Sequence, residues 1–155
     1  MRYWRWEGQL KGMLETTLID REIMEKDDRI CISWDFDDTL ATLVPCGWNG
    51  EMLVSKPKFV DLLKEYHALG CKCIILTART DNLPNINEIN NFLKSHDVHH
   101  TISEIVFTEH KPKGPFAKEL NVKLHYDDDE SQLESVRSHG IKTICSVASK
   151  HVAFI

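Results

Sequence analysis

The sequence predicts a single α/β domain with a doubly wound parallel sheet, and two observations support this prediction. From Arg29 onward, short apolar runs rich in β-branched residues alternate with longer amphipathic stretches. The amphipathic stretches are long enough to form helices, and strands separated by helices form parallel sheets that are covered on both faces. In such sheets ligands bind at the carboxyl ends of the strands.

Residues 1–28 are expected to form an extension of the domain that occupies residues 29–155. Within the extension, LKGMLETTLIDREIMEK (10–26) has its apolar residues on one helical face, which predicts a helix packed on the core. The preceding RYWRW (2–6) mixes arginines with aromatic residues and could stack on nucleic-acid bases. Docking of this short terminus on the domain surface is the favoured interpretation.

The domain begins with the strand RICISWDF (29–36), and a short flap follows it. About twenty residues, TLVPCGWNGEMLVSKPKFV (42–60), are available for the flap, enough for a hairpin but not for an inserted domain. Trp48 could stack on a base or sugar there, although packing against the hairpin is favoured. The segment 56–70 has Pro57 near its start and Gly70 as a stop, which predicts a helix.

The remaining elements follow the same alternation. The expected strands are CKCIILTA (71–78), EIVFT (104–108), VKLHYD (122–127) and KTICSV (142–147), and the expected helices are NINEINNFLKSH (85–96), GPFAKELN (114–121) and ESQLESVRSHG (130–140).

The composition narrows the functional classes. A net charge of -5 over 155 residues gives no general attraction to nucleic acid or to anionic membranes. No apolar stretch approaches the roughly 20 residues of a membrane span. The five cysteines are odd in number and several lie in strand-like runs, which favours reduced thiols over disulfides. We therefore expect a soluble, cytoplasmic protein, whose oligomeric state the sequence leaves open.

Polar side chains follow three of the predicted strands. Asp35 and Asp37 lie at the end of the first strand, Thr77 at the end of the second, and Asp127 and Asp128 at the end of the fourth. All of them fall on the same rim of a parallel sheet. If the chain stays extended after the first strand, the i, i+2 spacing places its first two carboxylates on one side, with Asp38 pointing away.

Carboxylates that converge from separate strands repel one another unless a cation is present, and acidic oxygen ligands favour Mg²⁺. Such a metal, a threonine hydroxyl and a lysine would together hold a phosphoryl group. Lys111 and Lys113 both lie near a predicted helix start, and the latter is favoured because it directly precedes Gly114. One aspartate could attack phosphorus while another protonates the leaving oxygen. His125 has no recognised ligand spacing, and a place near the sheet surface is expected for it.

In these four patterns the sequence resembles the haloacid dehalogenase (HAD) superfamily of phosphohydrolases. The apolar strand with Asp-x-Asp-x-Thr is CISWDFDDTLA, and the strand that ends in threonine is CIILTART. The lysine near a helix start is found in KPKGPFAKEL, and the strand that ends in paired acids is VKLHYDDDE. The resemblance implies a Rossmann-like HAD fold, with a short flap instead of a cap domain. The last part of the chain is also loosely similar to the phosphatase domain of phage polynucleotide kinase.

The resemblance implies a role for each matching residue. Asp35 would be the nucleophile and a Mg²⁺ ligand, and Asp37 the general acid and base, with its backbone carbonyl also reaching the metal. Asp127 and Asp128 would complete the metal shell. A phosphatase is favoured over the dehalogenase and phosphonatase branches, which do not keep the second acid.

Substrate binding is assigned to Thr77 and Arg79, together with the lysine of the third motif, which is either Lys113 or Lys111. The expected partner is a phosphorylated small molecule or a nucleic-acid end, without a membrane. The alternative is a non-catalytic nucleic-acid- or phosphate-binding module on a degenerate HAD fold. A response-regulator receiver is disfavoured, because its acidic pair comes first in the chain rather than last.

Overall fold

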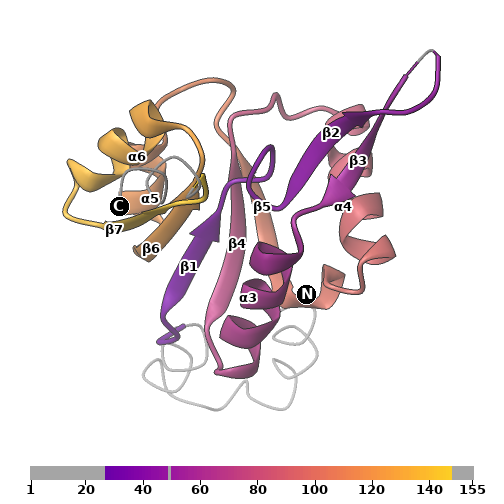
Figure 1. The fold of residues 1–155 in the computed structure, drawn as a ribbon. Coiled ribbons are helices and arrows are strands. Elements are labelled where there is room, and N and C mark those ends of the chain that lie inside the picture. The colour runs from indigo at the N-terminus through magenta and orange to yellow at the C-terminus, as the bar shows by residue number, and fades with distance from the viewer. Residues whose placement is uncertain (1–26, 49, 148–155) are drawn as a thin grey trace, which may run out of the picture.

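The structure is a computed structural model that describes residues 27–48 and 50–147 (Figure 1). The helix expected in residues 10–26 and the RYWRW segment lie outside the described residues.

A five-stranded parallel sheet forms the centre of the domain (Figure 1). Its strands, in the order β5-β4-β1-β6-β7, are β5 (Ile102–Phe107), β4 (Lys72–Thr77), β1 (Cys31–Trp34), β6 (Val122–Asp127) and β7 (Lys142–Cys145). All five match the runs predicted as strands. The chain passes from β1 outward to β4 and β5, then returns to the other side of β1 with β6 and β7. The space beside the carboxyl ends of β1 and β6 is therefore the topological switch point, where such sheets bind ligands.

Two pairs of helices cover the two faces of the sheet (Figure 1). Helices α3 (Pro57–Ala68) and α4 (Leu83–Ser95) supply buried residues to the larger apolar cluster, which contains Trp34. Helices α5 (Lys113–Glu119) and α6 (Glu130–Arg137) contribute to a second cluster around Ile74 and Leu76. The short 3₁₀ helix η2 (His99–Thr101) leads into β5. In the described ranges, no helix has the length and apolar character needed to cross a membrane.

Side-chain alternation along β1 and β6 separates an aromatic face from a polar one. Trp34 and Tyr126 are cross-strand partners whose rings stack at 4.2 Å on the face covered by α3 and α4. The residues on either side of them, Ser33 and Asp35 in one chain segment and His125 and Asp127 in the other, point to the opposite face, toward α5 and α6. The sequence thus places these four polar side chains together at the centre of the sheet, on the face opposite the stacked aromatic rings.

The flap is the predicted hairpin. Strands β2 (Ala41–Pro45) and β3 (Glu51–Ser55) pair antiparallel and extend away from the sheet (Figure 1). The expectation that Trp48 packs against the hairpin is wrong, because 99% of this residue is exposed. Strand pairing ends at Pro45 and Glu51, so Trp48 lies in the turn, where no neighbouring strand covers it.

Candidate active site

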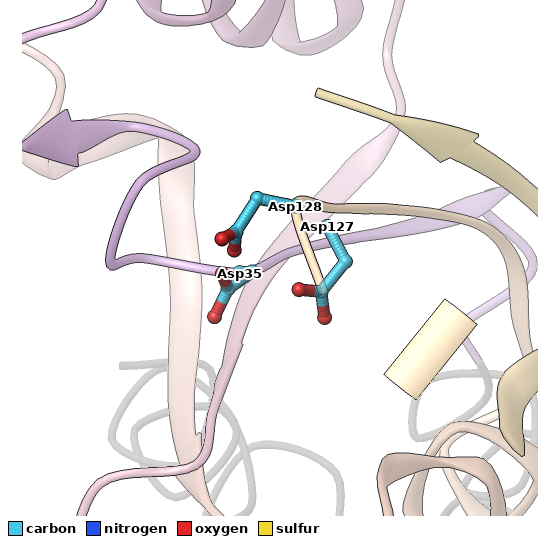
Figure 2. Close-up of side chains that lie close together, drawn as sticks. All are labelled: Asp35, Asp127 and Asp128. Atoms are coloured by element: carbon cyan, nitrogen blue, oxygen red, sulfur yellow. The ribbon is translucent and has the colours of Figure 1, made fainter. Parts of the chain in front are cut away.

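Three carboxylates meet at the switch point. Asp35 follows β1, Asp127 ends β6 and Asp128 comes next, and one oxygen from each lies within 4.8 Å of the others (Figure 2). The backbone N–H of Asp35 donates to the Tyr126 carbonyl at 2.8 Å, so strand pairing continues up to the acids and fixes their mutual position. Asp35 and Asp127 are buried, with 6% and 1% exposed.

Lys113 bridges two of these acids. Its Nζ lies 2.8 Å from Asp35 Oδ1 and 2.7 Å from Asp127 Oδ2, and the residue is 1% exposed. Lys113 is the first residue of α5, and its backbone N–H donates to Gln132 of α6. Lys111 is exposed, and no ion pair joins it to this cluster in the part of the chain that the structure describes. The structure therefore brings Lys113, and not Lys111, to the acids.

The surroundings shift the pKa values of the acids and the lysine in different directions. Burial raises the pKa of Asp35, and the Asp127 charge adds to this effect, while Lys113 opposes it. For Asp127, burial is outweighed by the hydrogen bond from His125 and the charge of Lys113, so its pKa is lowered. Burial would lower the pKa of Lys113, but the two carboxylates outweigh burial and raise it. Without a cation, these shifts favour the charged forms of Asp127 and Lys113 and the protonated form of Asp35.

His125 lies beneath Asp127 on the same strand. It is fully buried rather than close to solvent, and its Nε2 lies 2.8 Å from Asp127 Oδ2. Its Nδ1 lies 2.6 Å from Ser33 Oγ, on the paired strand β1. Burial lowers the pKa of His125, which favours the neutral ring. Sequence reasoning did not connect these residues to the acids, although each lies two positions before one of them.

The carboxylate of Asp37 points to a different partner. Arg79 Nε and Nη2 donate to its two oxygens at 2.8 and 2.7 Å, a two-pronged ion pair. The guanidinium also contacts Asn85 and Glu88 of α4 and lies 5.2 Å from the centre of the Phe36 ring. Arg79, expected to bind substrate, thus holds Asp37 in place. A metal contact through the Asp37 backbone carbonyl stays a prediction.

The two threonines of the motifs lie in the turn between β1 and β2 and at the end of β4. Thr39 Oγ1 donates to Asp35 Oδ2 at 3.3 Å, and its own oxygen is 3.0 Å from Ser146 Oγ. Thr77 is the last residue of β4 and is fully buried, and its Oγ1 accepts from the Arg79 backbone N–H at 3.3 Å. Asp38 is exposed, its backbone has a left-handed conformation (φ 63°), and its carboxylate accepts a hydrogen bond from Thr42 Oγ1 at 2.9 Å.

The donor set suits a hard divalent cation. Carboxylate oxygens are the ligands that Mg²⁺ prefers, and three of them lie together here from two neighbouring strands. Asp127 Oδ2 already accepts hydrogen bonds from Lys113 and His125, so the other oxygen, Oδ1, retains a lone pair for a cation. Asp35, Asp127 and Asp128 would therefore hold the ion.

Comparisons with known proteins identify the fold. No family model matches the chain, and no curated protein sequence matches it either. A chain from a structure of the Pnkp1/Rnl/Hen1 RNA repair complex is similar over 77% of this chain and 43% of its own length, with a TM-score of 0.60 and 16% identity. A protein from Thermotoga maritima, assigned as a beta-phosphoglucomutase, is similar over 81% of this chain and 98% of its own length, with a TM-score of 0.54 and 12% identity.

This chain therefore spans less than half of the RNA repair chains that it matches, since the share is 47% and 43% in the two structures. At these identities the likeness concerns the fold alone. The chain has the HAD-like fold that the four sequence motifs predict.

Proposed function

We propose that the chain is a Mg²⁺-dependent phosphohydrolase that cleaves a phosphate monoester through an aspartyl-phosphate intermediate. The observation that carries the proposal is the buried Lys113, which bridges Asp35 and Asp127 beside Asp128. A buried ammonium between two carboxylates, with a third carboxylate adjoining, is costly to maintain for stability alone. The same groups form a charge-balanced cradle for a phosphoryl group once a cation is present.

In the first step, a carboxylate oxygen of Asp35 attacks phosphorus, the bond to the ester oxygen breaks, and the alcohol leaves with a proton from Asp37. Arg79 keeps Asp37 oriented for this transfer, and each carboxylate oxygen retains lone-pair capacity beyond its contact with Arg79. Lys113 and the Thr77 hydroxyl would bind the non-reacting phosphoryl oxygens.

In the second step, Asp37 takes a proton from a water molecule, which attacks phosphorus and releases inorganic phosphate. Asp35 is then regenerated as a carboxylate. The bound Mg²⁺ would supply positive charge that stabilises the phosphoryl oxygens and favours the ionised form of Asp35.

The substrate belongs to a class that an open site admits: a nucleotide, a polynucleotide end or a sugar phosphate. The short hairpin in place of a cap domain supports this range. The fold shared with a chain of an RNA repair complex supports testing the polynucleotide end first. A cytoplasmic location is part of the proposal, supported by five free thiols.

The proposal is tested by hydrolysis of a panel with and without Mg²⁺, comparing the wild-type chain with Asp35→Asn. The panel contains an aryl phosphate, nucleoside monophosphates, 5′- and 3′-phosphorylated oligonucleotides and hexose phosphates. We expect Mg²⁺-dependent release of phosphate by the wild type and a loss of roughly 10³-fold or more in kcat for the variant. Reduction of the acyl phosphate with borohydride during turnover should label residue 35, which peptide mass spectrometry detects.

Asp38→Asn is the matched control, because Asp38 belongs to the same acidic run but is exposed, and its carboxylate contacts Thr42 rather than Lys113. Its activity should stay within about threefold of the wild type. Equal losses in the two variants would contradict the nucleophile assignment, and no hydrolysis of any ester by the wild type would favour the non-catalytic phosphate-binding alternative.

A further inference from the structure

The polar column beneath the acids contains two buried residues that the proposed reaction does not use. Ser33 and His125 are cross-strand partners on β1 and β6, and each precedes an acid of the site by two positions. Because side chains two apart on a strand share a face, this pair forms a layer directly under Asp35 and Asp127. Both members of the pair are fully buried.

The contacts of His125 determine its tautomer. Its Nε2 lies 2.8 Å from Asp127 Oδ2, which also accepts a hydrogen bond from Lys113. Because an ionised carboxylate can only accept hydrogen bonds, Nε2 must be the donor. In the neutral ring Nδ1 is then an acceptor, and the Ser33 hydroxyl, 2.6 Å away, donates to it. Each atom is therefore either a donor or an acceptor, and hydrogen bonds run in series from Ser33 to His125 and from His125 to Asp127.

This chain of hydrogen bonds fixes which oxygen of Asp127 can reach a cation. Oδ2 accepts hydrogen bonds from His125 and Lys113, and Oδ1 accepts one from the backbone N–H of Asp129, at 3.1 Å, as its sole contact of this kind among the described residues. Without His125, rotation of the carboxylate about its terminal torsion would be opposed only by the flexible Lys113 and that backbone contact. Groups that orient metal-binding carboxylates typically change metal affinity by 10- to 100-fold when they are removed.

We propose that His125, held by Ser33, is a positioning residue that orients the Asp127 carboxylate and thereby sets the affinity of the Asp35, Asp127 and Asp128 cluster for its divalent cation. This inference rests on the proposed function, since it takes the cluster to be the metal site. It adds that two residues buried in the sheet hold one of the metal-binding carboxylates in its orientation.

The test measures binding of Mn²⁺ alone, by electron paramagnetic resonance, to the full chain without substrate. His125→Leu removes both polar contacts and should weaken Mn²⁺ binding by about tenfold or more. His125→Gln should restore affinity to within about threefold of the wild type, because its amide nitrogen occupies the place of Nε2 and can donate to Asp127. Ser33→Ala should give an intermediate loss, since it removes only the group that orients the ring.

The control lies on the opposite face of the same strand. Tyr126 donates or accepts one hydrogen bond with Tyr66, between hydroxyls 2.8 Å apart, and Tyr126→Phe removes it without touching the acids. This variant should change the unfolding midpoint but not the Mn²⁺ affinity, so a general loss of packing is distinguished from a loss of positioning.

Equal Mn²⁺ affinities for the wild type and His125→Leu would overturn the inference while leaving the proposed phosphatase intact. An affinity in His125→Gln as weak as that in His125→Leu would also overturn it, because donation to Asp127 would then not be the cause. Absence of Mn²⁺ binding to the wild type would overturn the inference together with the metal role in the proposed function.

Discussion

Lys113 provides the sharpest test of how charge is balanced inside this domain. The substitution Lys113→Met keeps most of the apolar stem and removes the ammonium that lies between Asp35 and Asp127. Because the lysine is 1% exposed, water cannot replace it, so the Asp127 carboxylate loses its cationic partner and Asp35 loses a hydrogen-bond donor. Breaking a buried ion pair by removing one partner typically costs about 3–5 kcal/mol. For a domain of this size that loss lowers the thermal midpoint by roughly 10 °C.

The measurement is urea unfolding of the metal-free protein, with Lys111→Met as the matched control. Lys111 is two positions away and exposed, so its substitution should leave the free energy of unfolding nearly unchanged. The loss in Lys113→Met should grow from pH 6 to pH 8, because protonation of a carboxyl relieves the unpaired charge at low pH.

A double variant tests whether the loss comes from the carboxylates. Asp127→Asn removes the charge that Lys113 neutralises in the metal-free protein, so the two substitutions together should cost at least about 1 kcal/mol less than the sum of their separate costs. Strict additivity, or a loss in Lys113→Met no larger than that in Lys111→Met, would refute the reasoning.

Three further results are expected. Metal-free protein should lose thermal stability from pH 7 through about 9, because the raised pKa of Asp35 keeps a proton on the folded state that the unfolded state has already lost. Asp35→Asn should flatten this dependence in thermal melts, and identical slopes would contradict it. Arg79→Lys cannot make the two-pronged contact with Asp37, so kcat in steady-state assays should fall about tenfold; an unchanged kcat would remove Asp37 positioning from the mechanism. Gly114→Ala should cost about 1–3 kcal/mol in urea unfolding, because its Cβ would clash with the Ser135 carbonyl oxygen; no loss would mean that α5 and α6 separate easily.

The elements of the fold were predictable because each one is specified locally. The strand runs are short, apolar and β-branched, and α3 has Pro57 at its start, so neither prediction needs a distant contact. The helix expected from Gly114 begins one residue earlier, at Lys113, which is within the usual fraying of helix ends. The place of Trp48 was not predictable, since burial of a hairpin residue depends on which other element reaches it.

The partners within the site were harder to predict, because they depend on which strands are neighbours. That Asp35 and Asp127 meet follows from the motif resemblance, but the contact of Asp37 with Arg79 requires that β4 lie beside β1. The pairing of Ser33 with His125 requires the register of β1 on β6 as well. A sequence gives the spacing along each strand but not the register between strands. From the sequence alone, Ser33 and His125 are therefore two polar residues with no predicted contact.

The charge of the site explains why these features occur together. With Asp35, Asp127, Asp128 and Lys113 all ionised, the cluster carries two net negative charges, which would repel the dianion of a phosphate monoester. In the metal-free protein, the raised pKa of Asp35 removes one of these charges by protonation, but it also removes the nucleophile. A divalent cation removes the repulsion and restores the carboxylate at the same time. On the proposed function, cation binding and activation of Asp35 are therefore one event, and the orientation that His125 gives to Asp127 bears on both.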